Sequence, residues 1–155
     1  MQVITMSNTK ILFLHGLDSS KESTKFHAIN AIKKYCINVD YRNLNYQTVE
    51  RFYHDIIEKI KPDLLKHRIP TVIANPSLKP DFRDDYPEIN EADLEHDIPQ
   101  IAYIELGDEV LDMYKVFEQL DPYMQIETVE GGHHRLAQPE NLNRLIRYME
   151  QTFIY

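Results

Sequence analysis

The sequence predicts an α/β protein built on a mostly parallel, doubly wound sheet with helices on both faces. Short apolar runs alternate with stretches of helical spacing along most of its 155 residues. Several of these runs stop abruptly at Gly or at Asn-Pro, and the composition, 43% hydrophobic and 27% charged, is typical of a globular domain. We therefore expect one domain over residues 1–155, with its chemistry at the carboxyl ends of the strands.

The first half of the chain predicts two β-α repeats. Ile11–Leu14 is a continuous apolar run that ends at a His-Gly pair, which indicates a buried strand with a sharp stop. Helical spacing of apolar residues follows over Phe26–Cys36, and alternation over Cys36–Tyr41 predicts a second strand. Val49–Ile60 has the clearest helical periodicity of the chain and predicts an amphipathic helix.

The second half continues the alternation after a polar interval. The expected elements are a strand over Thr71–Ala74, a buried strand over Ile101–Leu106, a helix over Val110–Phe117, a strand over Met124–Val129 and a final helix over Leu142–Phe153. Residues 79–99 are polar and rich in proline, so we expect a loop or a reduced lid there.

The connection before Thr71 is too short for the predicted topology. If Pro62–Leu65 and Thr71–Ala74 are both strands of a parallel sheet, only Lys66–Pro70 joins them, whereas a parallel crossover needs roughly a dozen residues. One strand could run antiparallel, or Leu64 and Leu65 could end the preceding helix. Alternatively, a strand–turn–helix unit is absent from this chain.

Four segments resemble the α/β-hydrolase fold and, within it, the small bacterial YqiA/YcfP-like esterases. They are Ile11–Ser20, Ala74–Pro80, Gly107–Asp112 and Glu130–His134, and they stand in the order of that family over most of the chain. The resemblance implies a three-layer α/β-hydrolase-like sandwich and a Ser-Asp-His triad in that chain order.

The resemblance also implies a role for individual residues. Asp108 falls on the catalytic acid and His134 on the catalytic histidine, while Gly16 and Leu17 fall on the backbone side of the oxyanion hole. The family's serine lies in a Gly-x-Ser-x-Gly-Gly elbow, and this stretch is missing between about Leu65 and Lys66. The nucleophile is therefore unknown, and its expected position coincides with the short connection.

These residues also have plainer interpretations. Asp108 could cap the helix that follows it, and His134 could be an ordinary loop histidine, with His133 as a weaker catalytic alternative. Glu105 and Asp112 are expected to face solvent or to cap a helix. Adjacent histidines on an extended chain point apart, so we expect no metal site, and the family implies no cofactor.

Composition excludes other classes of function. The chain has four glycines, Gly16, Gly107, Gly131 and Gly132, and they cannot form a dinucleotide-binding loop, a Walker A loop or a complete nucleophile elbow. The net charge of −8 disfavours a nucleic-acid or anionic-membrane partner. Cys36 is the only cysteine and is expected in the core. No apolar run approaches the ~18 residues of a membrane span, and the start does not resemble a leader, so we expect a cytoplasmic protein.

Two hypotheses of different classes follow. In the first, the protein is a serine hydrolase of a carboxylic ester or thioester, and the segment that carries its serine is missing from this sequence. In the second, the chain has truly lost the nucleophile and is a catalytically inactive binding or scaffold protein with a hydrolase-like fold. The sequence specifies neither the acyl group nor the oligomeric state.

Overall fold

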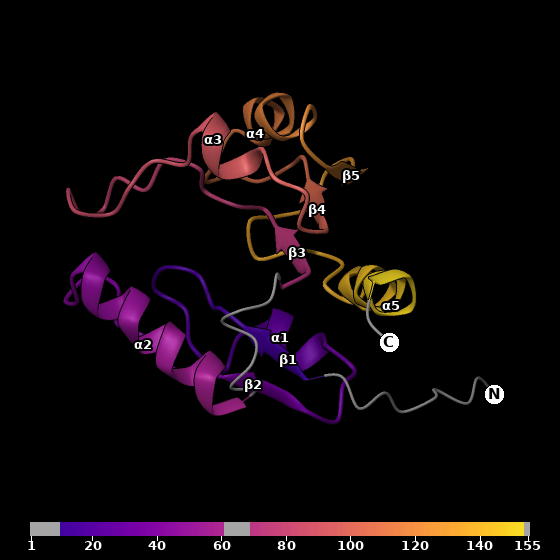
Figure 1. Cartoon of the computed structure of the whole chain (residues 1–155). Coiled ribbons are helices and arrows are strands. Elements are labelled where there is room, and N and C mark those ends of the chain that lie inside the picture. The colour runs from indigo at the N-terminus through magenta and orange to yellow at the C-terminus, as the bar shows by residue number, and fades with distance from the viewer. Residues whose placement is uncertain (1–9, 61–68, 154–155) are drawn as a thin grey trace.

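A computed structural model of the chain describes residues 10–60 and 69–153, and it confirms an α/β arrangement with parallel strands (Figure 1). The elements in chain order are β1 (Ile11–Phe13), α1 (Thr24–Ala28), β2 (Lys34–Cys36), α2 (Tyr46–Ile60), β3 (Thr71–Ala74), α3 (Glu91–Leu94), β4 (Gln100–Glu105), α4 (Met113–Leu120), β5 (Gln125–Val129) and α5 (Asn141–Phe153).

The larger sheet contains β3, β4 and β5 in that order, and both strand pairs are parallel. β4 is central, and every residue from Ile101 to Glu105 is buried. Successive side chains point to opposite faces, so Ala102 and Ile104 pack with α4, whereas Ile101 and Tyr103 pack with α5. Helices thus cover both faces of this sheet, as Figure 1 shows with α4 and α5 on opposite sides.

A second, smaller sheet is formed by β1 and β2, which pair in parallel with Leu12 opposite Tyr35. The described strands therefore form two small sheets, whereas the sequence predicted one. β1 was expected to be a buried strand, but its residues are only half-buried, and Leu14 lies beyond its end with 54% of its surface exposed. The physical reason is that β1 has a strand on only one side in the part of the chain that the structure describes.

The helix expected over Phe26–Cys36 ends early. α1 stops at Ala28, and Ile29 adopts an extended conformation. The Nζ of Lys34 donates hydrogen bonds to the carbonyl oxygens of Phe26 (2.8 Å) and Ile29 (3.0 Å), which satisfies groups exposed by the helix end. Lys34–Cys36, at the end of the range expected to be helical, forms β2 instead. The second strand thus lies nearer the N-terminus than the Cys36–Tyr41 predicted for it.

The remaining elements follow the predicted pattern closely. β3 matches its predicted bounds, and β4 and β5 begin or end within one residue of theirs. α2, α4 and α5 occur where apolar periodicity placed them, although α4 begins at Met113, after a turn that the sequence did not separate from the helix. Pro62–Leu65 and the junction between Leu65 and Lys66 lie outside the described residues.

The polar interval 79–99 is a loop apart from α3, and it lies against the first half of the chain. Asp85 accepts a hydrogen bond from the backbone N–H of Tyr46 (2.8 Å), and the guanidinium of Arg83 donates to the carbonyl oxygen of Arg42 (2.9 Å). Asn143 of α5 makes a second link, because its side chain bonds the carbonyl oxygen of Ala28 (2.8 Å). These hydrogen bonds connect the part of the chain that forms the smaller sheet with the part that forms the larger one.

β4 and β5 stay adjacent beyond the ends of both strands. The backbone N–H of Leu106 donates to the carbonyl oxygen of Val129 (2.9 Å), and that of Gly107 donates to Gly131 (2.7 Å). A Cβ at Gly107 would lie 2.6 Å from the carbonyl carbon of Gly131, so only glycine fits. No helix in the described ranges is long and apolar enough to cross a membrane.

Gly107→Ala is expected to destabilise the fold, because its methyl group would push against the Gly131 backbone, and overpacking of this kind costs about 1–3 kcal/mol. Gly16→Ala is the matched control, since no heavy atom outside its chain neighbours lies within 4 Å of the added Cβ. Urea unfolding of both variants measures the effect. Equal midpoints would contradict the close approach.

Candidate active site

Asp108 lies three residues after the end of β4, and its side chain is fully buried. One oxygen, Oδ1, accepts hydrogen bonds from the backbone N–H groups of Val110 (2.7 Å) and Leu111 (2.8 Å). The other oxygen, Oδ2, accepts from the side chains of Asn75 (3.1 Å) and His134 (2.7 Å). Burial acts to raise the pKa of Asp108, but these bonds outweigh it and hold the pKa below its ordinary value of 3.8. Asp108 is therefore ionised at neutral pH.

Helix capping is done by another residue. The N-cap of α4 is Asp112, whose Oδ1 accepts from the backbone N–H groups of Tyr114 (3.1 Å) and Lys115 (3.3 Å). The capping role expected for Asp112 is thus confirmed. The helix-cap interpretation of Asp108 is therefore wrong. Its Oδ1 accepts from the turn before α4, and its Oδ2 binds side chains.

His134 is brought to Asp108 by the turn after β5. Gly131 (φ +72) and Gly132 (φ +82) both occupy the left-handed region, so the chain reverses sharply beside Gly107. The Nδ1 of His134 lies 2.7 Å from Oδ2 of Asp108, and about a third of the imidazole remains exposed. Because the ionised carboxylate only accepts, Nδ1 carries the proton, and in the neutral form of the imidazole Nε2 then has the free lone pair that a general base needs.

Asn75 is a site residue that the sequence did not single out. It follows β3 with φ +39 and is buried. Its Oδ1 accepts from the backbone N–H of Glu105 (2.8 Å), and its Nδ2 donates to both the Glu105 carbonyl (3.2 Å) and Asp108. The side-chain amide extends the β3–β4 pairing and supports the acid. Its position in an Asn-Pro pair after a strand was the available signal.

Glu105 corrects a sequence expectation. It was expected to face solvent or cap a helix, yet it is 0% exposed, because it is the last residue of a central strand. Its carboxylate accepts hydrogen bonds from the turn that holds His134. Alternation along β4 could have predicted its inward direction, but not the polar partners that make its burial possible.

The predicted oxyanion loop follows β1, which belongs to the smaller sheet, whereas Asp108 and His134 follow strands of the larger one. His15 fixes its start: Nδ1 donates to the carbonyl oxygen of Gly16 (2.8 Å), Nε2 accepts from the backbone N–H of Val39 (2.8 Å), and His15 is buried. Gly16 and Leu17 are exposed. Within the described ranges, no hydrogen bond or ion pair joins Gly16 or Leu17 to the Asp108–His134 pair.

Among the described residues, no hydroxyl or thiol group bonds His134, whose hydrogen-bond partners there are Asp108 and Glu109. The Oγ of Ser20 accepts from the backbone N–H of Glu22 (3.0 Å) and so stabilises a local turn. Cys36 is half-buried, and burial raises the pKa of its thiol, so it is a poor nucleophile. The nucleophile expected between Leu65 and Lys66 falls outside the described residues.

One further histidine and a lysine complete the surroundings of the Asp108–His134 pair. The exposed His133 lies 3.9 Å from the carboxylate of Glu109 and makes no contact with Asp108. Lys25 of α1 is partly buried; burial lowers its pKa, while the negative charges of Asp108 and Glu105 oppose that shift. The first half of the chain thus places a cation within electrostatic range of the pair. The described ranges contain no cluster of three or more potential metal ligands.

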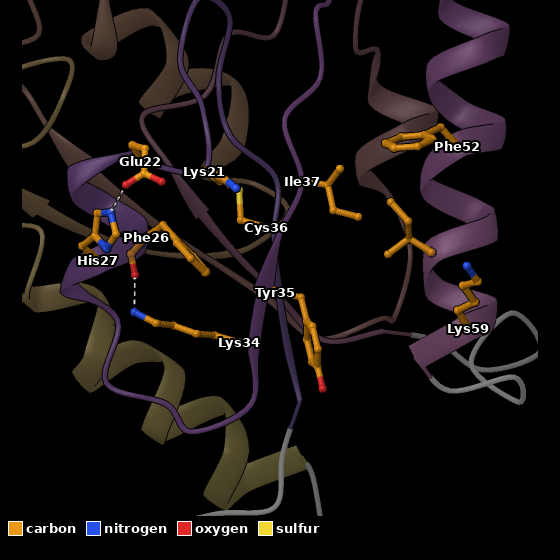
Figure 2. Close-up of a pocket in the computed structure, with 11 residues that line it drawn as sticks. Lys21, Glu22, Phe26, His27, Lys34, Tyr35, Cys36, Ile37, Phe52 and Lys59 are labelled. Carbon is orange, nitrogen blue, oxygen red and sulfur yellow. Dashed lines mark hydrogen bonds and ion pairs between the residues drawn. The ribbon is translucent and has the colours of Figure 1, made fainter.

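A groove with a volume of about 620 Å³ lies elsewhere, between α1, β2 and α2. Figure 2 shows Phe52 on α2 across from Ile37, Tyr35 in the middle of the groove, and an ion pair between Glu22 and His27 at the opposite side. Neither Asp108 nor His134 lines this groove. We place the candidate site at the Asp-His pair because hydrogen-bonded acid and base groups perform chemistry, whereas an apolar groove alone does not.

Comparison with known proteins gives no family assignment. No protein-family model matches the chain, and no curated protein matches it. The candidate site therefore stands on its residues and their geometry.

Asp108→Asn is expected to destabilise the protein near neutral pH, with a difference that shrinks in acid. The folded pKa lies below 3.8, so the carboxylate stabilises the fold above that value and loses this contribution as pH falls through the folded pKa. Urea unfolding between pH 7 and about pH 3 measures the trend.

Asp112→Asn is the control for this series, because Asn caps a helix about as well as Asp. Its stability should stay close to that of the unmodified protein near neutral pH. A loss for Asp108→Asn that stayed constant across the pH range would contradict an ionised, hydrogen-bonded Asp108.

Proposed function

We propose that the protein is a serine hydrolase of the α/β-hydrolase type that cleaves a carboxylic ester or thioester. The observation that carries the proposal is the 2.7 Å bond between the buried carboxylate of Asp108 and Nδ1 of His134. This pair orients the imidazole, fixes its tautomer and leaves Nε2 as a general base near the surface. The acid and the histidine also follow their strands in the order that the family resemblance implies.

The proposed reaction has two steps. Nε2 of His134 takes the proton of a serine hydroxyl as Oγ attacks the acyl carbon, and Asp108 stabilises the resulting imidazolium. The histidine then protonates the departing alkoxide or thiolate. In the second step, His134 activates water, which cleaves the acyl-enzyme to the acid and restores the serine. Backbone N–H groups of Gly16 and Leu17 would hold the oxyanion.

The serine is proposed to belong to a segment that is missing between about Leu65 and Lys66. Two open strand edges support this. Among the described strands, β1 pairs only with β2, and β3 pairs only with β4. One parallel strand between β1 and β3 would join both sheets into the order β2-β1-strand-β3-β4-β5. In such an order the direction of strand succession reverses between β1 and the added strand, and doubly wound proteins place their ligand sites at such a point.

A second candidate function is a binding or scaffold protein that has lost the nucleophile. It is favoured by one observation: no hydroxyl in the described residues contacts His134. This candidate retains the Asp-His pair only as a structural feature.

Intact mass and covalent labelling separate the two candidates. The missing-segment proposal expects the natural protein to exceed 18.4 kDa and to be labelled by a serine-directed fluorophosphonate. A mass of 18.4 kDa without labelling would overturn it in favour of the binding protein. Labelling at 18.4 kDa would keep the hydrolase and reject the missing segment.

His134→Ala is expected to lower kcat for a p-nitrophenyl ester or an acyl thioester by about 10⁴-fold or more, because the general base is lost. His133→Ala is the matched control, since its imidazole is exposed and contacts Glu109 rather than Asp108. Steady-state kinetics of both variants provide the measurement. A similar loss in both would contradict the assignment of the base to His134.

A further inference from the structure

Glu105 is a buried carboxylate that the proposed reaction does not use. It ends β4 on the same face as Ile101 and Tyr103, which is covered by α5. An ionised carboxylate in such a place is costly unless donors surround it. The reason for its presence must therefore lie in the groups that bind it.

Four donors surround this carboxylate. Oε1 accepts from the backbone N–H groups of His133 (3.1 Å) and Ala137 (2.6 Å). Oε2 accepts from the backbone N–H of Gln138 (3.0 Å) and from the hydroxyl of Tyr103 (2.8 Å). Burial acts to raise the pKa of Glu105, but these bonds prevail and hold it below the ordinary value of 4.5. The group is ionised at neutral pH.

Three of the four donors belong to the turn that carries His134, and they lie on both sides of it. The turn also packs on Glu105 at Gly132, where a Cβ would lie 2.7 Å from the Cβ of Glu105. The backbone on either side of His134 is thus bound to one rigid group at the end of β4. Asp108 is attached to the same strand end, three residues later.

We propose that Glu105 is a positioning residue for His134. It holds residues 133–138 so that the imidazole meets Asp108 with Nδ1 as the protonated nitrogen. The catalytic part of this inference rests on the proposed hydrolase function; the geometric part does not. Each member of the Asp-His pair is then fixed to β4, Asp108 through the chain and His134 through the Glu105 carboxylate.

Glu105→Gln tests the proposal, because its amide group would face N–H donors in place of one carboxylate oxygen. Ring ¹⁵N shifts of His134 report which nitrogen carries the proton. We expect the Nδ1–H form to dominate in the unmodified protein and a mixture of both tautomers in Glu105→Gln. In the hydrolase, kcat should fall about 100-fold with little change in KM, as expected for a misplaced catalytic group.

Tyr103→Phe is the matched control. It removes the one donor to Glu105 that does not belong to the turn, and it leaves the three backbone bonds in place. In this variant, the His134 tautomer and kcat should stay close to those of the unmodified protein. If Glu105→Gln does not fold, Glu105→Asp replaces it, since this variant keeps the charge but is too short to reach all donors.

The outcomes are separable. A folded Glu105→Gln or Glu105→Asp with unchanged His134 ring shifts would overturn the positioning role, whatever the activity. Changed ring shifts in a protein that hydrolyses no ester or thioester would retain the positioning role and reject the proposed function. Equal effects of Glu105→Gln and Tyr103→Phe on the His134 tautomer would also overturn the positioning role. The effect would then not depend on the bonds between Glu105 and the turn.

Discussion

Two ionised carboxylates at the end of β4 determine how the second half of the chain is assembled. Glu105 and Asp108 are shielded from solvent, and a buried carboxylate must find donors. The donors come from three other segments: Asn75 after β3, the turn before α4, and the turn after β5. Satisfying two side chains thus requires the ends of all three strands of the larger sheet to converge at one place.

The same requirement explains why the hydrogen-bond partners of the Asp-His pair, within the described ranges, all come from Asn75 onward in the sequence. Gly107 lets the β4 and β5 ends touch, Gly132 lets the turn pack on Glu105, and Asn75 closes the other side. In the described residues, no buried side-chain nitrogen or oxygen lacks a hydrogen-bond partner. A polar cluster whose hydrogen bonds are all formed is rigid, and this rigidity gives the imidazole of His134 a defined direction.

The parts of this fold that could be predicted from sequence are those with a strong local period. Thr71–Ala74, the apolar run of β4 and the stripes of α2 and α5 have only one good interpretation each. α1 and β2 were misplaced because the apolar spacing before Cys36 suits a helix, while pairing with β1 forms a strand there. Resemblance indicated Asp108 and His134. Glu105 was missed because backbone donors from a distant turn leave no trace in side-chain patterns.

Among the described strands, β1 and β3 are each paired on one side only, and this bears on the choice between the two candidate functions. A parallel strand is ordinarily paired on both sides and covered on both faces, and an unpaired edge leaves backbone groups available to other chains. β3 lies next to a fully buried strand, yet its own residues are exposed or half-buried. Loss of one central strand from a stable domain would leave both edges unpaired and would cost a large part of the ~5–15 kcal/mol that stabilises a typical domain. A longer chain would contribute the strand that pairs with both edges and also the turn that carries the serine. We therefore favour the hydrolase over the scaffold protein.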